Sequence, residues 1–217
     1  MCEENSFHGN FGPVQFDVLK EIGNIGAGHA ATSLSTLLNE KIEMHVPGVE
    51  IVDFDEVMEL AGGADKEVVS IYQRIGGDAP GSMFFVLTPP HADRFVQRLT
   101  GTPQGETGAE IDPEMSISAL QELGNILSGA YLTALSDFTK LDLSPTVPFL
   151  AQDLVGAILS VGLIELSQVS DQAIVIKTSL MEGEGDQKEF IEGQFFLFPD
   201  PLSYKKIFTA MGVLHGD

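Results

Sequence analysis

The chain has 217 residues, 43% of them hydrophobic, and its 32 acidic residues outnumber 11 basic ones, giving a formal net charge of −21. Such a charge repels nucleic acid and anionic lipid, so we expect neither as a partner. The charge is explained equally well by a protein partner with basic residues and by a need for solubility. Cys2 is the single cysteine, which favours a reducing compartment. No apolar run approaches the roughly 18 residues of a membrane span, and the start of the sequence has no signal-peptide pattern. We therefore expect a soluble, cytoplasmic protein.

The first predicted element is a long helix that begins at Pro13, whose missing N–H is harmless in a first turn, and ends near Asn39. Alternating and β-branched residues over 42–54 predict a strand, with an irregularity at Pro47. The remaining elements expected in this half are a short helix capped by Asp53 or Asp55 and ending at Leu60, strands over 67–74 and 81–88, and a helix from Pro89 to Gly101.

The same order of elements recurs after a polar link over 102–111. We expect a long helix from Asp112 and Pro113 to Lys140, a strand over 141–150, a short helix over 153–163, strands over 173–181 and 190–198, and a helix over 201–211. Ten extra residues in this half are placed around the acidic turn 182–186, which we interpret as solvated. The predicted fold is α+β: one domain over 1–217, with α-β-α-β-β-α halves at 13–101 and 112–212, a pseudo-twofold axis, a mainly antiparallel sheet and two long helices.

A repeated segment supports this duplication. Residues 17–49 align without a gap to 118–150, an offset of 101. About a third of the aligned positions are identical, which is improbable by chance. In the numbering of the first copy the eleven identical positions are Leu19, Glu21, Gly23, Asn24, Ile25, Gly28, Thr32, Leu34, Ser35, Val46 and Pro47.

Four polar or small residues form one stripe on each long helix, at spacings i, i+4, i+7 and i+11. The stripes are Asp17, Glu21, Asn24 and Gly28 in the first copy, and Ser118, Glu122, Asn125 and Gly129 in the second. Their neighbours, Ile25 among them, are largely apolar and are expected to form the buried side. An ordinary solvated face would explain one stripe, but retention of Glu and Asn in both copies favours a site.

Glycines inside the first long helix each destabilise it by roughly 1 kcal/mol relative to alanine. Gly23, Gly26 and Gly28 are therefore expected to mark the close approach of a packed neighbour or of a docked partner.

No self-sufficient active site is evident in the sequence. The glycine-rich run 23–28 lies within a helical pattern rather than after a strand, the histidines lack the spacing of a zinc site, and the acidic run 53–56 suits a helix cap better than a metal. An asparagine amide can hold a water molecule, and a glutamate can bind a lysine or a metal-bound water of a partner. Positioning and electrostatics suffice for phosphoryl transfer when the partner brings the labile bond and the metal.

The pattern Asp/Ser-x3-Glu-x2-Asn-x22-Pro resembles the motif of the CheC/CheX/FliY family of chemotaxis phosphatases, and two intact copies are most similar to its CheC-type members. The resemblance implies hydrolysis of the phosphorylated response regulator CheY, with Mg²⁺ supplied by the regulator and no cofactor of the chain's own. The roles it implies are water positioning by Asn24 and Asn125, pairing with a regulator lysine by Glu21 and Glu122, support by Asp17 and Ser118, and shaping of the strands by Pro47 and Pro148.

CheC-type proteins also bind the receptor deamidase CheD through the short helix of the second half. Asp153 is the contact that this resemblance implies, although a helix cap explains it equally well. A non-catalytic adaptor for CheD is therefore the alternative function; a structural flagellar-switch relative is disfavoured because both copies keep Glu and Asn. We expect a monomer, since the duplication already supplies the symmetry of a dimer, and sites of unequal activity, since their neighbouring residues differ.

Overall fold

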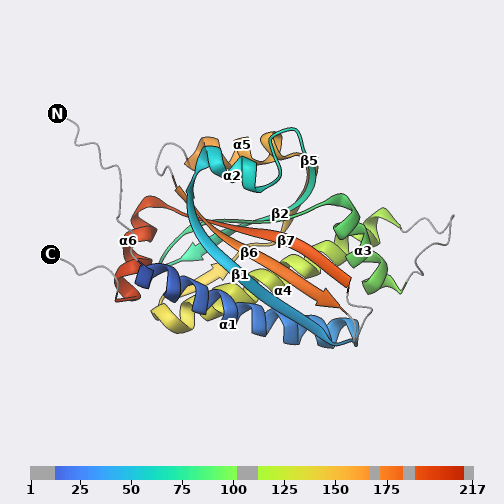
Figure 1. The fold of residues 1–217 in the computed structure, drawn as a ribbon, viewed down its shortest axis with the longest axis horizontal. Helices are drawn as coiled ribbons and strands as arrows, with labels where there is room; N and C mark the ends of the chain where they lie inside the picture. Colours follow the sequence, from blue (N-terminus) through green and yellow to red (C-terminus); the bar gives the residue numbers. More distant parts are fainter. Residues whose placement is uncertain (1–12, 102–111, 167–171, 183–188, 213–217) are drawn as a thin grey trace.

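The computed structural model describes residues 13–101, 112–166, 172–182 and 189–212 (Figure 1). The helices in these ranges are α1 (Pro13–Leu38), α2 (Phe54–Leu60), α3 (Pro89–Thr100), α4 (Pro113–Thr139), α5 (Val155–Leu166) and α6 (Pro201–Ala210). The strands are β1 (Ile42–Asp53), β2 (Glu67–Gly77), β3 (Gly81–Leu87), β4 (Leu143–Pro145), β5 (Phe149–Leu154), β6 (Gln172–Glu182) and β7 (Glu189–Pro199). Among the described helices, none is both long and apolar enough to cross a membrane.

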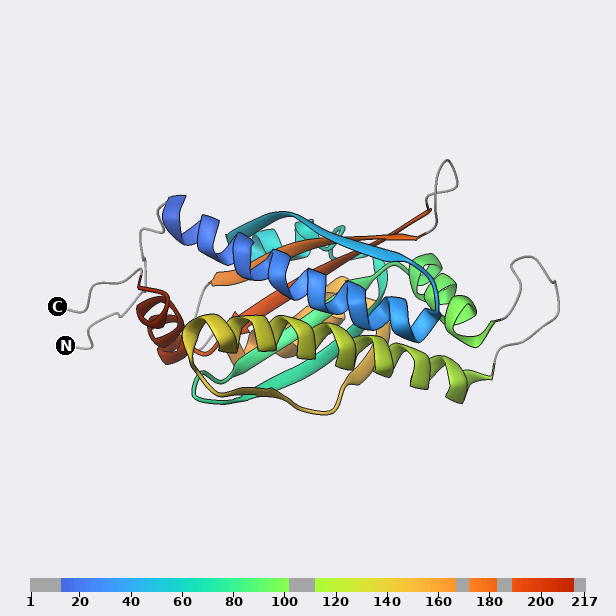
Figure 2. The same ribbon diagram turned by 90° about the horizontal axis from the view of Figure 1, so that it is seen from below.

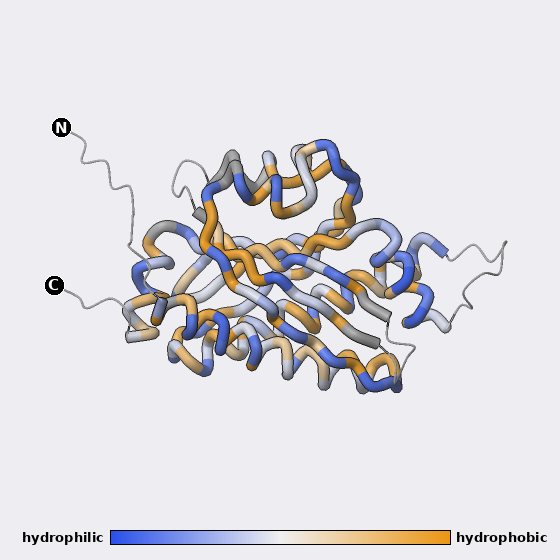
Figure 3. Tube along the Cα trace, in the orientation of Figure 1, coloured by the Kyte–Doolittle hydropathy of each residue, from blue (hydrophilic) through white to orange (hydrophobic). Residues whose placement is uncertain are grey.

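All strands join one antiparallel sheet in the order β1-β6-β7-β3-β2-β4, with β5 also pairing with β2. Helices α1 and α4 run side by side in opposite directions along one face, and α2 and α5 cover the other (Figures 1 and 2). A large apolar core fills the space between the sheet and the α1–α4 layer, and a smaller one lies beneath α2 and α5. Figure 3 shows the corresponding hydrophobic stretches along the strands.

The strand order is symmetric with respect to the two halves. Exchanging β1 with β5, β2 with β6, and β3 with β7 gives the same order read from the opposite end. At the centre Phe84 pairs with Phe196 in the core beneath α2 and α5, and Phe85 pairs with Phe195 in the core beneath α1 and α4. The predicted offset of 111 between these strands would exchange the two pairs and with them the two faces of the sheet. A twofold axis that keeps α1 and α4 on one face instead relates Phe85 to Phe195, an offset of 110. Each half contributes its outer strand to the other half, because β1 pairs with β6 and β5 pairs with β2.

The predicted ends of the two long helices are confirmed to within one residue. At the start of α4, the Asp112 carboxylate accepts a hydrogen bond from the Glu114 N–H at 3.0 Å, which satisfies one of the free donors of the first turn. Asn39 and Lys140 follow the last residues of α1 and α4 with φ of 52° and 60°. This left-handed conformation turns the chain out of each helix.

Two predictions for the strand and short helix of the second half are wrong. The strand predicted over 141–150 is instead the two short strands β4 and β5, separated at Pro148, whose missing N–H cannot extend a ladder. The short helix begins at Val155 rather than at Asp153, because Asp153 belongs to β5 and lies opposite Val68 of β2. Asp153 is therefore neither the cap nor a residue of that helix.

The extra residues of the second half are also distributed differently from the prediction. Ile71 lies opposite Phe85, and Ile176 lies opposite Phe195, the counterpart of Phe85 on the same face of the sheet. The offset between β2 and β6 is thus 105, so four of the ten residues enter before β6 and five between β6 and β7. The predicted link 102–111 and most of the acidic turn, 183–186, lie outside the described residues.

Candidate functional site

The two polar stripes lie on the exposed sides of α1 and α4. Asp17, Glu21, Asn24 and Gly28 are all exposed, as are Ser118, Glu122 and Asn125, while Gly129 is partly exposed. The opposite sides of the helices are buried against the sheet because their apolar residues recur with helical spacing. Figure 2 shows both helices along the same face, so both stripes are carried by one layer of the molecule.

Glu21, Asn24 and Glu122 make no side-chain hydrogen bond or ion pair to any part of the chain that the structure describes. The only such contact at Asn125 is through its backbone C=O, which accepts a hydrogen bond from Ser128 Oγ at 3.3 Å. The carboxylates and amides of both Glu–Asn pairs are therefore available to an incoming partner.

Glycines at the buried edge of each stripe hold the helices close to the sheet. A Cβ added to Gly23 would lie 3.4 Å from Val46 Cγ1, and one added to Gly124 would lie 2.5 Å from Ile71 Cγ2 and 3.4 Å from Pro148 Cβ. Each glycine directly precedes the asparagine of its stripe. The close packing of these turns fixes the height of Asn24 and Asn125 above the sheet.

A third glycine marks the contact between the two helices. A Cβ on Gly26 would lie 2.7 Å from Cδ1 of Tyr131, so α1 needs glycine where it passes the tyrosine of α4. The Tyr131 ring lies 4.8 Å from that of Phe195, and its hydroxyl is 3.2 Å from Thr178 Oγ1. Burial raises the pKa of Tyr131 from 10.0 to about 12, against a lowering by the Thr178 hydrogen bond. The prediction that glycines mark close approach is confirmed at Gly26, whereas a Cβ on Gly23 would make only an ordinary contact with Val46.

The motif prolines occupy different environments. Pro47 is exposed at a register shift between His45 and Gly48, and its neighbour Val46 is 4% exposed. In the second copy the arrangement is reversed, because Pro148 is buried beneath α4 and Val147 is 82% exposed. Gln121 Nε2 donates to the Pro148 C=O at 3.5 Å.

The glycines that end the stripes have no such packing role. A Cβ built on Gly28 or on Gly129 meets nothing within 4 Å. Ile25 also departs from the prediction: it is 38% exposed rather than part of the buried side. Its position four residues after Glu21 was visible in the sequence and places it at the edge of the exposed stripe.

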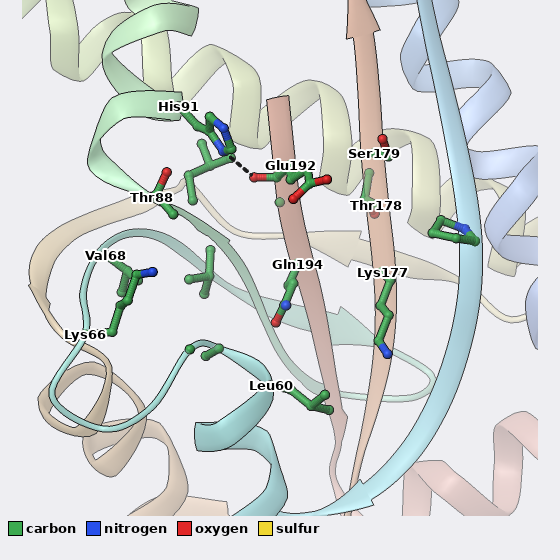
Figure 4. Close-up of a pocket in the computed structure, with 16 residues that line it drawn as sticks. Leu60, Lys66, Val68, Thr88, His91, Lys177, Thr178, Ser179, Glu192 and Gln194 are labelled. Atoms are coloured by element: carbon green, nitrogen blue, oxygen red, sulfur yellow. Dashed lines mark hydrogen bonds between the residues drawn. The ribbon is translucent and has the colours of Figure 1, made fainter. Parts of the chain in front are cut away.

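A cavity of about 360 Å³ lies apart from the stripes (Figure 4). Lys177 and Gln194 line it and alternate along their strands with Ile176 and Phe195, which pack toward the α1–α4 layer. The cavity therefore lies on the opposite face of the sheet, with Pro47 as its only motif residue. In the described residues no three His, Cys, Asp or Glu side chains are grouped so that they could hold a metal ion.

Asp153 lies far along the chain from both stripes, on the exposed side of β5. Its Oδ1 accepts a hydrogen bond from the Leu154 N–H at 2.7 Å. Exposed apolar residues lie around it on the same segment, with Val147 at 82%, Phe149 at 65% and Leu154 at 43%. Sequence reasoning missed this apolar surface, because the segment was predicted as a strand over 141–150 followed by a short helix over 153–163.

The CheC-like family model matches residues 14–51 and 115–151, the two segments that carry the stripes. The chain is 47% identical over 198 residues to the CheY-P phosphatase CheC of Bacillus subtilis (strain 168), covering 91% of this chain and 94% of that protein. It is 31% identical over 134 residues to the flagellar motor switch phosphatase FliY of the same organism, covering 59% of this chain and 34% of that protein.

Solved structures share the fold at lower identity. FliY of Thermotoga maritima superposes with a TM-score of 0.72 at 22% identity, covering 94% of this chain and 98% of that one. The FliM middle domain of H. pylori gives a TM-score of 0.63 at 11% identity, covering 93% of this chain and 100% of that one.

Proposed function

Since this chain belongs to the CheC-like family, we propose that it is a phosphatase that hydrolyses the aspartyl phosphate of the response regulator CheY-P. The observation that carries the proposal is the pair of exposed Glu–Asn sites, whose side chains make no bond to the described residues. The regulator CheY is the proposed partner because the B. subtilis relative, similar over nearly its whole length, is a CheY-P phosphatase.

In this mechanism the asparagine positions the nucleophile. The amide of Asn24 or Asn125 holds a water molecule by donating and accepting hydrogen bonds, in line with the phosphorus–oxygen bond. The water oxygen attacks phosphorus, the bond to the aspartyl oxygen breaks, and inorganic phosphate and the free carboxylate leave with release of a proton. The phosphoryl group is already labile and Mg²⁺ is supplied by the regulator, so the chain adds only positioning.

The glutamate of each pair anchors the regulator. Glu21 and Glu122 lie one helical turn before their asparagines and are exposed. Each carboxylate pairs with a lysine of the regulator, which sets the amide at the height of the phosphoryl group. Asp17 and Ser118 support the same stripe one turn earlier. The strong negative charge of the chain steers a regulator surface with basic residues toward the helices.

A second function, binding of the deamidase CheD by a monomeric, cytoplasmic protein, is favoured by a separate observation. Asp153 lies on β5 among exposed apolar residues, including Phe149 and Leu154, and opposite Val68, which packs in the core beneath α2 and α5. Such a mixed apolar and charged surface suits a protein partner. Both functions can coexist, since the two surfaces share no residue.

The test is the decay of purified CheY-P with Mg²⁺ present, in the presence of the wild type, Asn24→Ala, Asn125→Ala and the double variant. We expect the wild type to accelerate decay, each single variant to lose the contribution of its own site, and the double variant to lose about 10²-fold or more. Thr36→Ala, an exposed change further along α1, is the matched control and should retain full activity. Full activity in the double variant would contradict the role of the asparagines and favour the adaptor function.

A further inference from the structure

The identical positions of the two copies separate into those that the fold explains and those that it does not. Leu19, Gly23 and Leu34 are buried, as are their counterparts Leu120, Gly124 and Leu135. Ser35 Oγ accepts a hydrogen bond from the Ile42 N–H at 2.9 Å and so ties α1 to β1. Core packing is a sufficient reason to retain the leucines and glycines. The hydrogen bond explains Ser35 alone, because Oγ of its counterpart Ser136 is buried without a hydrogen-bond partner in the described residues.

The identical residues on the exposed surface form a single face. They are Glu21, Asn24, Ile25, Gly28 and Thr32, with counterparts Glu122, Asn125, Ile126, Gly129 and Thr133. Spacings of 3, 4, 7 and 11 from the glutamate place all five on one side of a helix. The Glu–Asn pair is thus one end of a longer face that continues along the helix toward its C-terminus.

Nothing within the described part of the molecule explains three of these residues on α1; on α4, Ile126 is partly buried and packs against the apolar core. A methyl group added to Gly28 or Gly129 would have open space within 4 Å, although glycine weakens a helix interior by roughly 1 kcal/mol. Ile25 exposes 38% of its surface beside Asn24, where a polar residue would be better solvated. Thr32 Oγ1 donates to its own helix, to the Gly28 C=O at 2.9 Å, so its methyl group and not its hydroxyl is left for outside contacts.

We propose that Ile25, Gly28 and Thr32, with Ile126, Gly129 and Thr133 on α4, form the remainder of the surface that contacts the regulator. This inference rests on the proposed function and adds the shape and chemistry of the partner. The regulator presents an apolar surface beside its phosphorylation pocket, opposite the isoleucine. Its surface also comes close to the helix backbone at the glycine, where a side chain would hold the two proteins apart.

The test uses Gly28→Gln combined with Gly129→Gln, and the milder alanine pair at the same positions. Ser33→Gln is the matched control: it is exposed on α1, half a turn around the helix from Asn24. Binding of the regulator with beryllofluoride as phosphoryl mimic, steady-state hydrolysis of CheY-P, and thermal unfolding are measured for each. The glutamine pair is expected to weaken binding and raise KM about tenfold or more, with little change in kcat, and with a melting temperature at or above that of the wild type.

The outcomes separate the contact surface from the catalytic proposal. If the glycine variants bind and hydrolyse like the wild type while Asn24→Ala with Asn125→Ala does not, the contact surface is wrong and the catalytic proposal stands. If the wild type binds the regulator without hydrolysing it, the catalytic proposal fails and the surface is judged from binding alone. Loss of kcat at unchanged KM, or lack of binding by the wild type, would also overturn the proposed surface.

Discussion

The segments beneath the two motif helices carry the same Val-Pro pair, yet the pair is oriented in opposite ways. In β1, Val46 is buried against α1 and Pro47 is exposed; beside α4, Pro148 is buried and Val147 is 82% exposed. The reversal is local, because the aligned residues before the pair, Ile42 and Leu143, and after it, Val49 and Leu150, all pack against the core beneath α1 and α4.

Both prolines interrupt the hydrogen-bonded pairing of strands. Pro47 lies where the pairing of β1 with β6 changes register, and Pro148 lies between β4 and β5. Both positions are on the outer strands of the sheet, where a residue without an N–H is tolerated and where an interrupted edge discourages pairing with other chains. The proline of the motif is therefore retained for interrupting an edge strand and not for one particular side-chain contact.

The largest expected effect tests this reversal directly. Val46→Asp places a carboxylate in the core and should lower the free energy of unfolding by about 4 kcal/mol or more, whereas Val147→Asp should change it by less than about 0.5 kcal/mol. Urea unfolding of the two variants measures both values. Equal losses in the two variants would mean that the valines face the same way in the two copies.

The sequence predicted the helices and the stripes well because both depend on local rules. Pro13, Asp112 and the i, i+4, i+7 spacing specify a helix start and a helix face whatever packs against them. The reversed orientation of the Val-Pro pair depends instead on how Pro148 fits beneath Gly124, a contact between separate elements that a gapless alignment hides. Ile25 was assigned to the core from its polarity alone, whereas its exposure depends on how α1 is rotated against the sheet.

The contact between α1 and α4 places a titratable residue on one helix and a non-titratable residue at the aligned position of the other. Tyr131 of α4 is buried against Gly26, while its counterpart in α1 is Ala30, which has no titrating group. The pKa of Tyr131 is about 12 in the folded protein and 10.0 in the reference state. Because the pKa is raised in the folded protein, the contribution of Tyr131 to the free energy of unfolding is fully present below pH 10. It is lost as the pH rises toward 12, since in this range the unfolded chain releases the phenolic proton and the folded protein keeps it.

We therefore expect the free energy of unfolding to fall by roughly 2 to 3 kcal/mol more in the wild type than in Tyr131→Phe between pH 9 and 12. Denaturant titrations at a series of pH values measure the difference. Identical pH profiles for the two proteins would show that the hydroxyl is solvated and that the helices do not exclude water at this point.

The smallest effect concerns the two glycines that precede the asparagines. Gly124→Ala should lower the free energy of unfolding by about 2 kcal/mol, because the new methyl group would lie 2.5 Å from Cγ2 of Ile71, a stiff and buried side chain. Gly23→Ala meets Val46 Cγ1 only at 3.4 Å, an ordinary contact, and should raise the stability by about 0.5 to 1 kcal/mol through helix propensity. Adding Ile71→Leu, which removes the branch at Cβ, should recover part of the loss in Gly124→Ala and none in Gly23→Ala, a coupling that a double-mutant cycle measures. Stabilisation by both alanines would contradict this asymmetry, since it would mean that α4 lies no closer to its strand than α1 does.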